Sequence, residues 1–385
     1  MAAPELVPAD YIVIGAGIAG ASVAYWLAPH GRTVILERES HPGYHTTGRS
    51  AAFYLTSYGT PQIRRLTMAS RPFFSAPPSG FAEHPVIGPR IGLMLAGVGQ
   101  EAQLDEAEAT VRSVFPAAPR LDRAATCALV PVLRPECVLG SVTQPDGGDI
   151  DVHGLHQGFL RGARQVGASL ICDAEVSALE RDSGQWLVRT GSGATMREFR
   201  APVVINAAGA WCDRVGALAG LRPLGLQPMR RSAFLFAPPP GIEVGAWPLT
   251  IATDHSCYFK PDAGLILASP ANADPVEPHD VQPEEIDIAT GIARIEALTT
   301  MTIRRPTRTW AGLRSFVPDG DLVGGFDPEA PGFFWLAGQG GYGVQTAPAA
   351  GEACAALARG IALPSALADF GLTAEMLSPA RLRNS

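Results

Sequence analysis

The chain has 385 residues, of which 46% are hydrophobic and 17% charged, and its formal net charge is −7. This length suits two interleaved domains with a sizeable core rather than one small domain. The absence of long like-charge runs and of an 18-residue apolar stretch argues against nucleic-acid binding, a polybasic membrane patch and a membrane span.

The N-terminal residues predict a parallel βαβ unit. Tyr11–Gly15 and Thr33–Glu37 are apolar runs typical of strands that are buried on both faces, and Ala21–Ala28 between them predicts a helix. The polar, glycine-containing segment that follows, His41–Tyr58, is expected to pass into a helix near Arg49.

The remaining elements predict a second strand–turn–helix unit at the C-terminus. Helices are expected over residues 61–74, 101–114, 151–166, 284–298 and 344–359. Strands are expected over residues 91–96, 168–172, 186–189, 202–207, 232–237, 257–260, 265–268 and 333–337, with a strand-rich stretch beginning at 309–314.

Nucleotide-type units therefore lie at both ends of the chain, whereas the middle carries strands of antiparallel appearance. The predicted fold class is α/β: a Rossmann-like dinucleotide-binding domain with an inserted, β-rich α+β substrate domain. We expect residues 1–80, 145–225 and 310–385 to form the first domain, and residues 81–144 and 226–309 to form the second.

The first strand runs into the motif Gly15-Ala16-Gly17-Ile18-Ala19-Gly20, which opens the first helix. The first glycine permits the tight turn, the second lets a pyrophosphate approach, and the third lets helix and strand pack closely. The helix N-terminus offers free N–H groups to the phosphates. Glu37 ends the second strand and is expected to bond a ribose hydroxyl pair, which argues against NADP.

Two later segments favour FAD over NAD. Small residues at Gly48-Arg49-Ser50-Ala51-Ala52 suit the close approach of a phosphate and a flat ring. The glycine-rich turn from Gly338 to Gly343 opens the last predicted helix, whose dipole would stabilise negative charge on a reduced flavin.

Several long stretches carry a family resemblance, among them DYIVIGAGIAGAS, INAAGAWCD, YFKPDAG, TWAGLRSFVPDGD and GQGGYGVQT. The chain resembles the amine-oxidising FAD family (DAO) of D-amino acid oxidase, glycine oxidase and sarcosine oxidase, and within it the bacterial D-arginine dehydrogenases most. The resemblance covers nearly the whole chain and implies non-covalent FAD in an extended conformation. The expected cofactor-binding residues, beyond Gly15, Gly17, Ile18, Ala19, Gly20 and Glu37, are Arg38, Thr47, Arg49, Ser50, Ala51, Ala52, Val176, Ala208, Gly209, Trp211, Gly338, Gly340, Gly341, Tyr342 and Gly343.

The resemblance also implies a substrate site. Arg314 matches the arginine that clamps the substrate carboxylate, and bidentate Arg–carboxylate pairing suits that role. Arg231 matches a second pocket arginine, and Tyr258 and Tyr58 match tyrosines that contact the carboxylate or cover the site. The backbone around Gly312 and Gly341 is expected to receive the amine, and the side-chain pocket is expected to include Leu249, Ile251 and Val344.

The sequence departs from D-arginine dehydrogenase where that enzyme holds the cationic end of its substrate. Gly92 stands in place of the family's glutamate, and no Asp or Glu occurs from His84 to Gly99. Phe53 stands in place of a pocket histidine. A buried guanidinium without a partner is costly, so we expect apolar side chains to be preferred over those of D-Arg or D-Lys, unless Glu83 reaches into the pocket.

The expected activity is FAD-dependent oxidative deamination of D-amino acids, with hydride transfer from Cα to flavin N5, giving an imino acid that hydrolyses to a keto acid and ammonia. The electron acceptor is either O2 or a quinone-type compound. Three alternatives stay open: oxidation of a secondary amine such as an N-methyl amino acid, proline or an opine; an NAD-linked or non-catalytic dinucleotide-binding protein; and a subunit of a larger amine dehydrogenase. The N-terminus lacks the features of a secretory signal and no metal-ligand spacing occurs, so we expect a cytoplasmic enzyme without a metal.

Overall fold

Apolar strands from three distant parts of the chain form one central sheet in the computed structural model, which describes residues 6–191 and 196–383. Its order is β10-β3-β2-β14-β22-β21, and all neighbours are parallel except the last pair. The strands are β2 (Tyr11–Ile14), β3 (Thr33–Leu36), β10 (Ser169–Ile171), β14 (Val203–Asn206), β21 (Val323–Phe326) and β22 (Phe333–Ala337).

Alternating side chains of these strands feed two separate cores. One face, which includes Val13, Ile35 and Ile205, shares a core with four helices. These are α1 (Ile18–Leu27), α2 (Pro61–Ser75), α5 (Val152–Gln165) and α8 (Gly343–Ala358). Of these, α1 and α8 contact the sheet, and α5 and α2 pack on α1 and α8. The other face, which includes Ile12 and Val204, shares a core with a small sheet and with α6 (Cys212–Leu218). The period of two along each strand explains this division.

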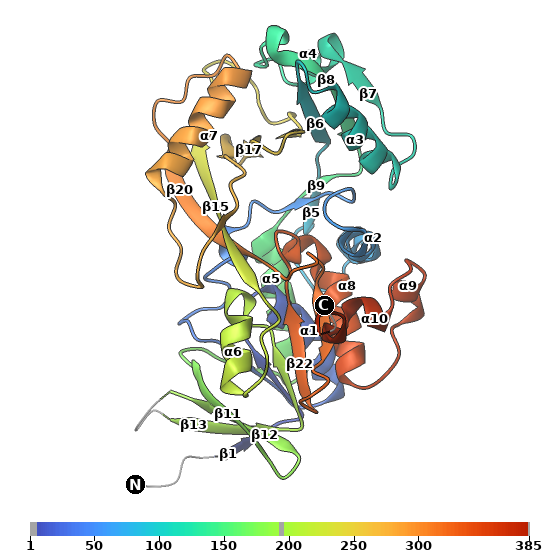
Figure 1. The fold of residues 1–385 in the computed structure, drawn as a ribbon, viewed down its shortest axis with the longest axis vertical. Helices are drawn as coiled ribbons and strands as arrows, with labels where there is room; N and C mark the ends of the chain where they lie inside the picture. The colour runs from blue at the N-terminus through green and yellow to red at the C-terminus, as the bar shows by residue number, and fades with distance from the viewer. Residues whose placement is uncertain (1–5, 192–195, 384–385) are drawn as a thin grey trace.

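The small sheet lies at the bottom of Figure 1 and has four strands in the order β1-β13-β12-β11. They are β1 (Leu6–Pro8), β11 (Val176–Asp182), β12 (Gln185–Thr190) and β13 (Arg197–Ala201). A three-stranded sheet, β4-β9-β5, lies between the central sheet and the upper part of the molecule. Its strands are β4 (Phe53–Tyr54), β5 (Ile87–Pro89) and β9 (Gly148–Ile150).

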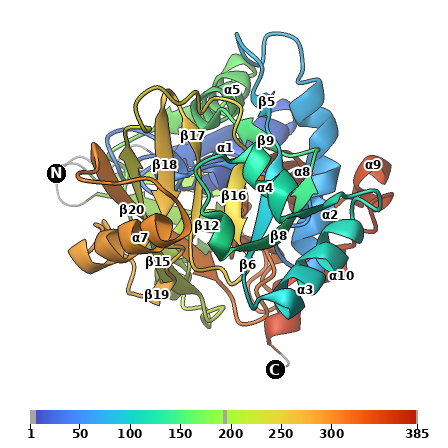
Figure 2. The ribbon, with the colours of Figure 1, turned by 90° about the horizontal axis from the view of Figure 1, so that it is seen from above.

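The upper part of Figure 1 is a nine-stranded sheet in the order β19-β15-β18-β17-β16-β6-β8-β7, with β20 paired to β15. Seen from above, α7 and α3 lie on opposite sides of it (Figure 2). The strands are β6 (Gly92–Gly97), β7 (Arg120–Asp122), β8 (Val138–Gln144), β15 (Gln227–Phe236), β16 (Leu249–Ala252), β17 (Tyr258–Asp262), β18 (Leu265–Ser269), β19 (Asp274–Pro275) and β20 (Arg308–Phe316). The remaining helices are α3 (Glu101–Arg112), α4 (Arg123–Leu129), α7 (Glu285–Leu298), α9 (Ser365–Ala368) and α10 (Ala374–Leu377).

Most predicted elements agree with the structure to within a few residues, and two details differ. The helix expected near Arg49 is wrong: Thr47–Arg49 is a single 3-10 turn, and residues 50–52 lead without regular structure into β4. The predicted domain boundary at residue 310 falls inside β20, which belongs to the nine-stranded sheet. Within the two described ranges, no helix combines the length and the apolarity that crossing a membrane requires.

Gly216 on α6 offers a test of the packing against the central sheet. A Cβ at this position would lie 2.2 Å from the Trp335 ring, which is fully buried and donates from Nε1 to Asp327 Oδ2 at 2.9 Å. Because the ring cannot move without losing that bond, we expect Gly216→Ala to lower stability by about 1–3 kcal/mol. Denaturation midpoints would measure this, with Gly245→Ala, in open space, as the control. Equal midpoints for the two variants would contradict this packing.

Candidate active site

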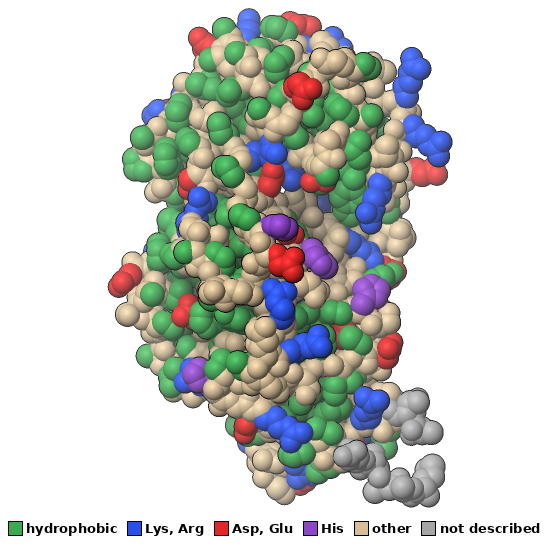
Figure 3. Space-filling model, turned by 180° about the vertical axis from the view of Figure 1, so that it is seen from behind, with side chains coloured by type: hydrophobic (Ala, Val, Ile, Leu, Met, Phe, Trp, Pro, Cys, Tyr) green, Lys and Arg blue, Asp and Glu red, His purple; other side chains and the backbone are tan. Residues whose placement is uncertain are grey.

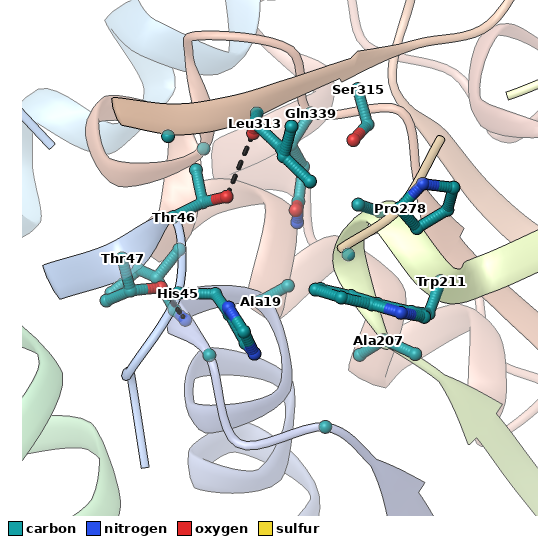
Figure 4. Close-up of a pocket in the computed structure, with 18 of the residues that line it drawn as sticks. Ala19, His45, Thr46, Thr47, Ala207, Trp211, Pro278, Leu313, Ser315 and Gln339 are labelled. Atoms are coloured by element: carbon teal, nitrogen blue, oxygen red, sulfur yellow. Dashed lines mark hydrogen bonds between the residues drawn. The ribbon is translucent and has the colours of Figure 1, made fainter. Parts of the chain in front are cut away.

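A cavity of about 780 Å³ opens at the carboxyl ends of β2, β3 and β14 and extends to the nine-stranded sheet. We call it the larger cavity. Ligand crevices in open α/β sheets lie at this end of the strands. Figure 3 shows a hollow near the middle of one face, where basic, acidic and histidine side chains gather. Figure 4 shows Ala19, Thr47, His45 and Trp211 around the cavity, with Leu313 and Gln339 on its opposite side.

The glycines of the first turn are required by close backbone approaches. Gly15 has a φ of +98°, and a Cβ there would lie 2.6 Å from the Ala207 carbonyl oxygen. A Cβ on Gly20 would lie 1.8 Å from the Gly15 carbonyl oxygen, so only glycine lets α1 begin this close to β2. The N-terminus of α1 is thereby held at the floor of the larger cavity, where its dipole favours an anion.

Side chains from later segments brace this turn. Glu37 Oε2 accepts from Ala16 N at 2.8 Å, Thr47 Oγ1 accepts from Ile18 N at 2.9 Å, and His156 Nε2 lies 2.8 Å from the Ala16 carbonyl oxygen. Burial lowers the pKa of His156, so this ring is neutral at pH 7 and donates to that carbonyl. Glu37 also lines the larger cavity at the end of β3, where it can meet a ribose.

Two loops meet over the larger cavity and form a strap. Arg49 Nη2 lies 2.5 Å from Asp280 Oδ1, and the Tyr44 hydroxyl donates to Asp280 Oδ2 at 3.0 Å. These two bonds lower the pKa of the Asp280 carboxyl. Thr46 Oγ1 donates to the Leu313 carbonyl at 2.9 Å, as Figure 4 shows. The strap thus joins residues 44–49 to both residue 280 and β20.

Most of the predicted cofactor-binding residues line the larger cavity. They are Gly15, Gly17, Ile18, Ala19, Glu37, Arg38, Thr47, Arg49, Ser50, Ala51, Val176, Ala208, Gly209, Trp211, Gly338, Gly340, Gly341 and Gly343. Three others do not line it: Gly20 lies beneath the turn, Ala52 lines a second cavity, and Tyr342 stacks edge-on against Tyr58. Their contact with a cofactor stays a prediction.

The second cavity, the smaller cavity, measures about 210 Å³ and shares Arg231, Tyr258, Arg314 and Gly341 with the larger one. It brings together almost all of the predicted substrate residues. These are Arg314, Arg231, Tyr258, Tyr58, Phe53, Leu249, Ile251, Gly341 and Val344. Gly312 lines only the larger cavity.

Arg314 and Arg231 meet in the smaller cavity because β20 pairs with β15. Arg314 Nη1 donates to the Tyr58 hydroxyl at 3.0 Å, and Arg231 Nε donates to the Asn272 carbonyl. Neither guanidinium forms an ion pair with a carboxylate among the described residues. Two neighbouring cations without an acid form a site that favours an anion.

The positive charge of Arg314 and Arg231 changes the pKa of a neighbouring tyrosine. Burial alone would raise the pKa of the Tyr58 phenol, but Arg314 and Arg231 outweigh burial and lower it. Tyr342, packed behind Tyr58, has its pKa raised to about 12, chiefly by burial. Burial and the neighbouring Arg314 lower the pKa of Arg231, although Tyr258 opposes this.

Gly92 does not line the smaller cavity, because Leu55 fills the space in front of it. A Cβ at Gly92 would lie 2.6 Å from Leu55 Cδ1, and Leu55 itself lines the cavity. Glu83, the alternative acid, is exposed and lies outside the lining of both cavities.

Sequence reasoning missed some residues of both cavities. In the smaller cavity these include Leu55, His255, Lys260, Ala271 and Gln345, and in the larger cavity Tyr44, His45 and Asp280. The period of two along a strand could have found Lys260, which shares a face with Tyr258. Asp280 lies 231 residues from Arg49, so no local pattern links them.

Comparisons with known proteins agree with this architecture. Glycine oxidase of Geobacillus kaustophilus superposes with a TM-score of 0.81 at 23% identity, covering 92% of this chain and 95% of that one. The L-proline dehydrogenase of P. horikoshii superposes with a TM-score of 0.78 at 21% identity, covering 99% of both chains. The fold is therefore the predicted one, a Rossmann-like FAD-binding domain with a sheet-rich substrate domain.

Sequence comparison defines the family. Residues 10–357 match the family of FAD dependent oxidoreductases named DAO, and the chain belongs to that family. The Geobacillus kaustophilus glycine oxidase is 25% identical over 377 residues, which span 94% of this chain and 96% of the relative. A Bos taurus protein, FAD-dependent oxidoreductase domain-containing protein 1, is 25% identical over 400 residues, or 90% of this chain and 80% of the relative.

FAD is accordingly the cofactor, and the chain is an oxidoreductase that carries it. The residues around the larger cavity fit this group. The α1 N-terminus can receive the pyrophosphate, Glu37 a ribose, and the glycine-rich turn before α8 can approach a flat ring closely. The volume lies within the range of small-molecule sites.

Removing the strap should loosen FAD. We expect Asp280→Ala to raise the dissociation constant of FAD about two- to fivefold, because Asp280 is partly exposed and its bonds to Arg49 and Tyr44 are of moderate strength. Fluorescence titration of the apoprotein would measure this. Glu277→Ala, in the same loop but paired only with the exposed Arg214, is the control. Equal constants in the two variants would rule out the strap as a cofactor clasp.

Binding of a carboxylate should weaken at alkaline pH. Once Tyr58 ionises, its phenolate neutralises Arg314 and competes with the ligand, and the pKa of Tyr58 is below the ordinary value of 10.0. We therefore expect the affinity for a simple carboxylate such as pentanoate to begin falling below pH 10, by up to tenfold per pH unit beyond that pKa. Calorimetric titration from pH 7 to 10 would follow this. A Tyr58→Phe variant that keeps the same alkaline loss would contradict the assignment.

Proposed function

We propose that this protein oxidatively deaminates D-amino acids and prefers apolar to cationic side chains. The observation that carries the proposal is the pair Arg314 and Arg231. Both guanidinium groups line the larger and the smaller cavity, and neither has a carboxylate partner among the described residues. An α-carboxylate bound there would supply the missing negative charge. The D-arginine dehydrogenase resemblance of these positions supports the same reading.

The chain's own residues can orient such a substrate. Arg314, Tyr58 and Tyr258 would fix the carboxylate, since each has donors at the cavity surface. The backbone around Gly341 would meet the amine, and a Cβ at Gly341 would lie 2.8 Å from Arg314 Cζ, so this position needs glycine. FAD, when bound, supplies the oxidation by accepting hydride from the substrate Cα. The contribution of the protein is position and charge complementarity.

The side-chain end of the smaller cavity supports the apolar preference. Phe53, Leu55, Leu249, Ile251 and Val344 form its walls. None of the described residues that line it is Asp or Glu. A cationic side chain would therefore lose hydration without gaining a partner there. Glycine, which fills little of about 210 Å³, would leave these walls uncovered.

A second candidate is the oxidation of a secondary amine. The relatives give it support, because one is named dimethylglycine dehydrogenase, 29% identical over 220 residues of the Mus musculus protein. Fold neighbours include an L-proline dehydrogenase and an iminodiacetate oxidase. The arginine pair would hold the carboxylate of such amines equally well. The electron acceptor under either candidate is O2 or a quinone-type compound.

Anaerobic bleaching of the flavin absorbance would decide between the two. The panel holds D-Leu, D-Met, D-Phe, D-Arg, glycine, sarcosine, L-Pro and L-Leu, each added alone to the purified holoprotein. Fast bleaching by apolar D-amino acids and slow bleaching by D-Arg is the expected result. Bleaching by sarcosine or proline alone would replace the proposal by the secondary-amine reading. Reoxidation of the bleached protein with O2 or with a soluble quinone would then identify the acceptor.

Arg314 should be needed for substrate binding. We expect Arg314→Ala to weaken the binding of the preferred D-amino acid by at least tenfold, because a hydrogen bond between charged groups contributes about 1.5–3 kcal/mol. Arg314→Lys should recover part of this loss. Arg308→Ala removes an exposed arginine from the same strand and is the control. An affinity for Arg314→Ala within twofold of the unmodified protein would rule out the clamp.

A further inference from the structure

Lys260 is a buried cation in the wall of the smaller cavity, and the proposed function gives it no role. Its side chain is 5% exposed, and it lines the cavity together with Tyr258, two residues earlier on β17. Residues two apart on a strand share a face, so both side chains come from β17 on the cavity side of the nine-stranded sheet.

The sheet register places Lys260 relative to the carboxylate clamp. Ile251 lies opposite Tyr258 across β16 and β17, so Leu249 stands one row further, beside Lys260. Leu249 in turn pairs with Gly92 on β6. Lys260 therefore belongs to the row that contains Leu249 and Gly92, with Leu55 in front of Gly92, one row from the tyrosine that contacts Arg231. This is the side-chain end of the cavity.

The ammonium of Lys260 is paired with two acids that do not line the smaller cavity. Its Nζ lies 2.8 Å from Asp149 Oδ1 and 3.5 Å from Asp262 Oδ1. Asp149 stands opposite Phe53 across β4 and β9, and cross-strand partners share a face. Phe53 lines the smaller cavity whereas Asp149 does not. The other oxygen of Asp149 accepts from Arg90 Nε at 2.5 Å.

The charged side chains that line the smaller cavity are all positive. Arg231, Arg314 and Lys260 are cations, and the exposed His255 is the remaining titratable base. The carboxylate nearest to the side-chain end, Asp149, is paired with Lys260 and Arg90. A carboxylate thus lies next to the cavity lining, and the cation that it pairs with from that lining is Lys260.

We propose that Lys260 determines the charge specificity of the smaller cavity: its ammonium takes the place beside Asp149 that the cationic end of a substrate would fill, and thereby rejects D-lysine and D-arginine. This inference rests on the proposed function for the identity of the substrate. It attributes the rejection of cationic substrates to the pairing of Asp149 with Lys260, and not only to the presence of glycine at position 92. Removing the ammonium should turn the cavity toward cations.

The test compares D-lysine with D-norleucine, which has the same carbon chain without the ε-ammonium. The ratio of their kcat/KM values cancels effects on the shared carboxylate and amine. We expect the unmodified protein to favour D-norleucine strongly. Lys260→Met, of similar size and without charge, should raise the D-lysine to D-norleucine ratio at least tenfold, because Asp149 then keeps only Arg90 as a partner and can pair with the ammonium of D-lysine.

Three further variants separate charge from shape. Lys260→Arg keeps the cation and should leave the ratio near that of the unmodified protein. Lys260→Met combined with Asp149→Asn removes both charges, so its ratio should fall between those of the unmodified protein and Lys260→Met. Asp149→Asn alone leaves Lys260 less neutralised and should not raise the ratio. FAD content and melting temperature would show that each variant is folded.

A binding measurement tests the same point without turnover. Hexanoate and 6-aminohexanoate are carboxylates that differ in one terminal ammonium, and neither has an α-amine to oxidise. Calorimetry on the holoprotein should give much weaker binding of 6-aminohexanoate than of hexanoate, and Lys260→Met should reduce that difference at least tenfold. This comparison remains valid if Lys260→Met lowers the rate for every substrate.

The outcomes separate this inference from the proposed function. Suppose that the unmodified protein oxidises D-norleucine, and that folded Lys260→Met keeps both the D-lysine to D-norleucine ratio of kcat/KM and the 6-aminohexanoate to hexanoate affinity ratio within twofold of the unmodified values. Lys260 then does not set charge specificity, and the inference is wrong. If no primary D-amino acid reduces the flavin, the proposed function fails. The hexanoate pair then still decides whether Lys260 excludes a cation from the cavity.

Discussion

The pairing of β15 with β20 is the constraint on which the proposed chemistry depends. It brings Arg231 and Arg314 into one cavity wall, although the two arginines are 83 positions apart in the sequence. Two cations held together without an acid are unfavourable in a folded protein unless an anion joins them. The sheet therefore maintains a site whose charge favours the binding of an anion. The tyrosines Tyr58 and Tyr258 reduce the repulsion but do not remove it.

The two cavities depend on different features of the chain: the larger one on glycines and the smaller one on charged side chains. Around FAD, the decisive feature is missing Cβ atoms, as at Gly15 and Gly20, because backbone must approach backbone. Around the smaller cavity, where we propose that the substrate binds, the main feature is side-chain charge: the Arg314–Arg231 pair, and Lys260 with its partner Asp149. Gly341 belongs to both cavities and needs to be small for the sake of Arg314.

Local patterns in the sequence were sufficient for the elements and the cofactor turn. The apolar runs at 11–15, 33–37 and 333–337 predicted buried parallel strands, because a strand that is buried on both faces has apolar residues at consecutive positions. The helix expected near Arg49 is wrong because tertiary contacts use the local backbone: the Arg49 carbonyl accepts from Trp310 Nε1. Lys260 and Asp280 were missed because their partners are distant in sequence, at Asp149 and Arg49.

The order of strands in the central sheet has a consequence for biosynthesis. β14 pairs with both β2 and β22, so the central sheet needs strands from near both ends of the described chain. The turn before α8 lines the FAD cavity. A ribosome releases the N-terminal βαβ unit long before these residues. The nascent chain must therefore carry an incomplete central sheet until β22 has been synthesised.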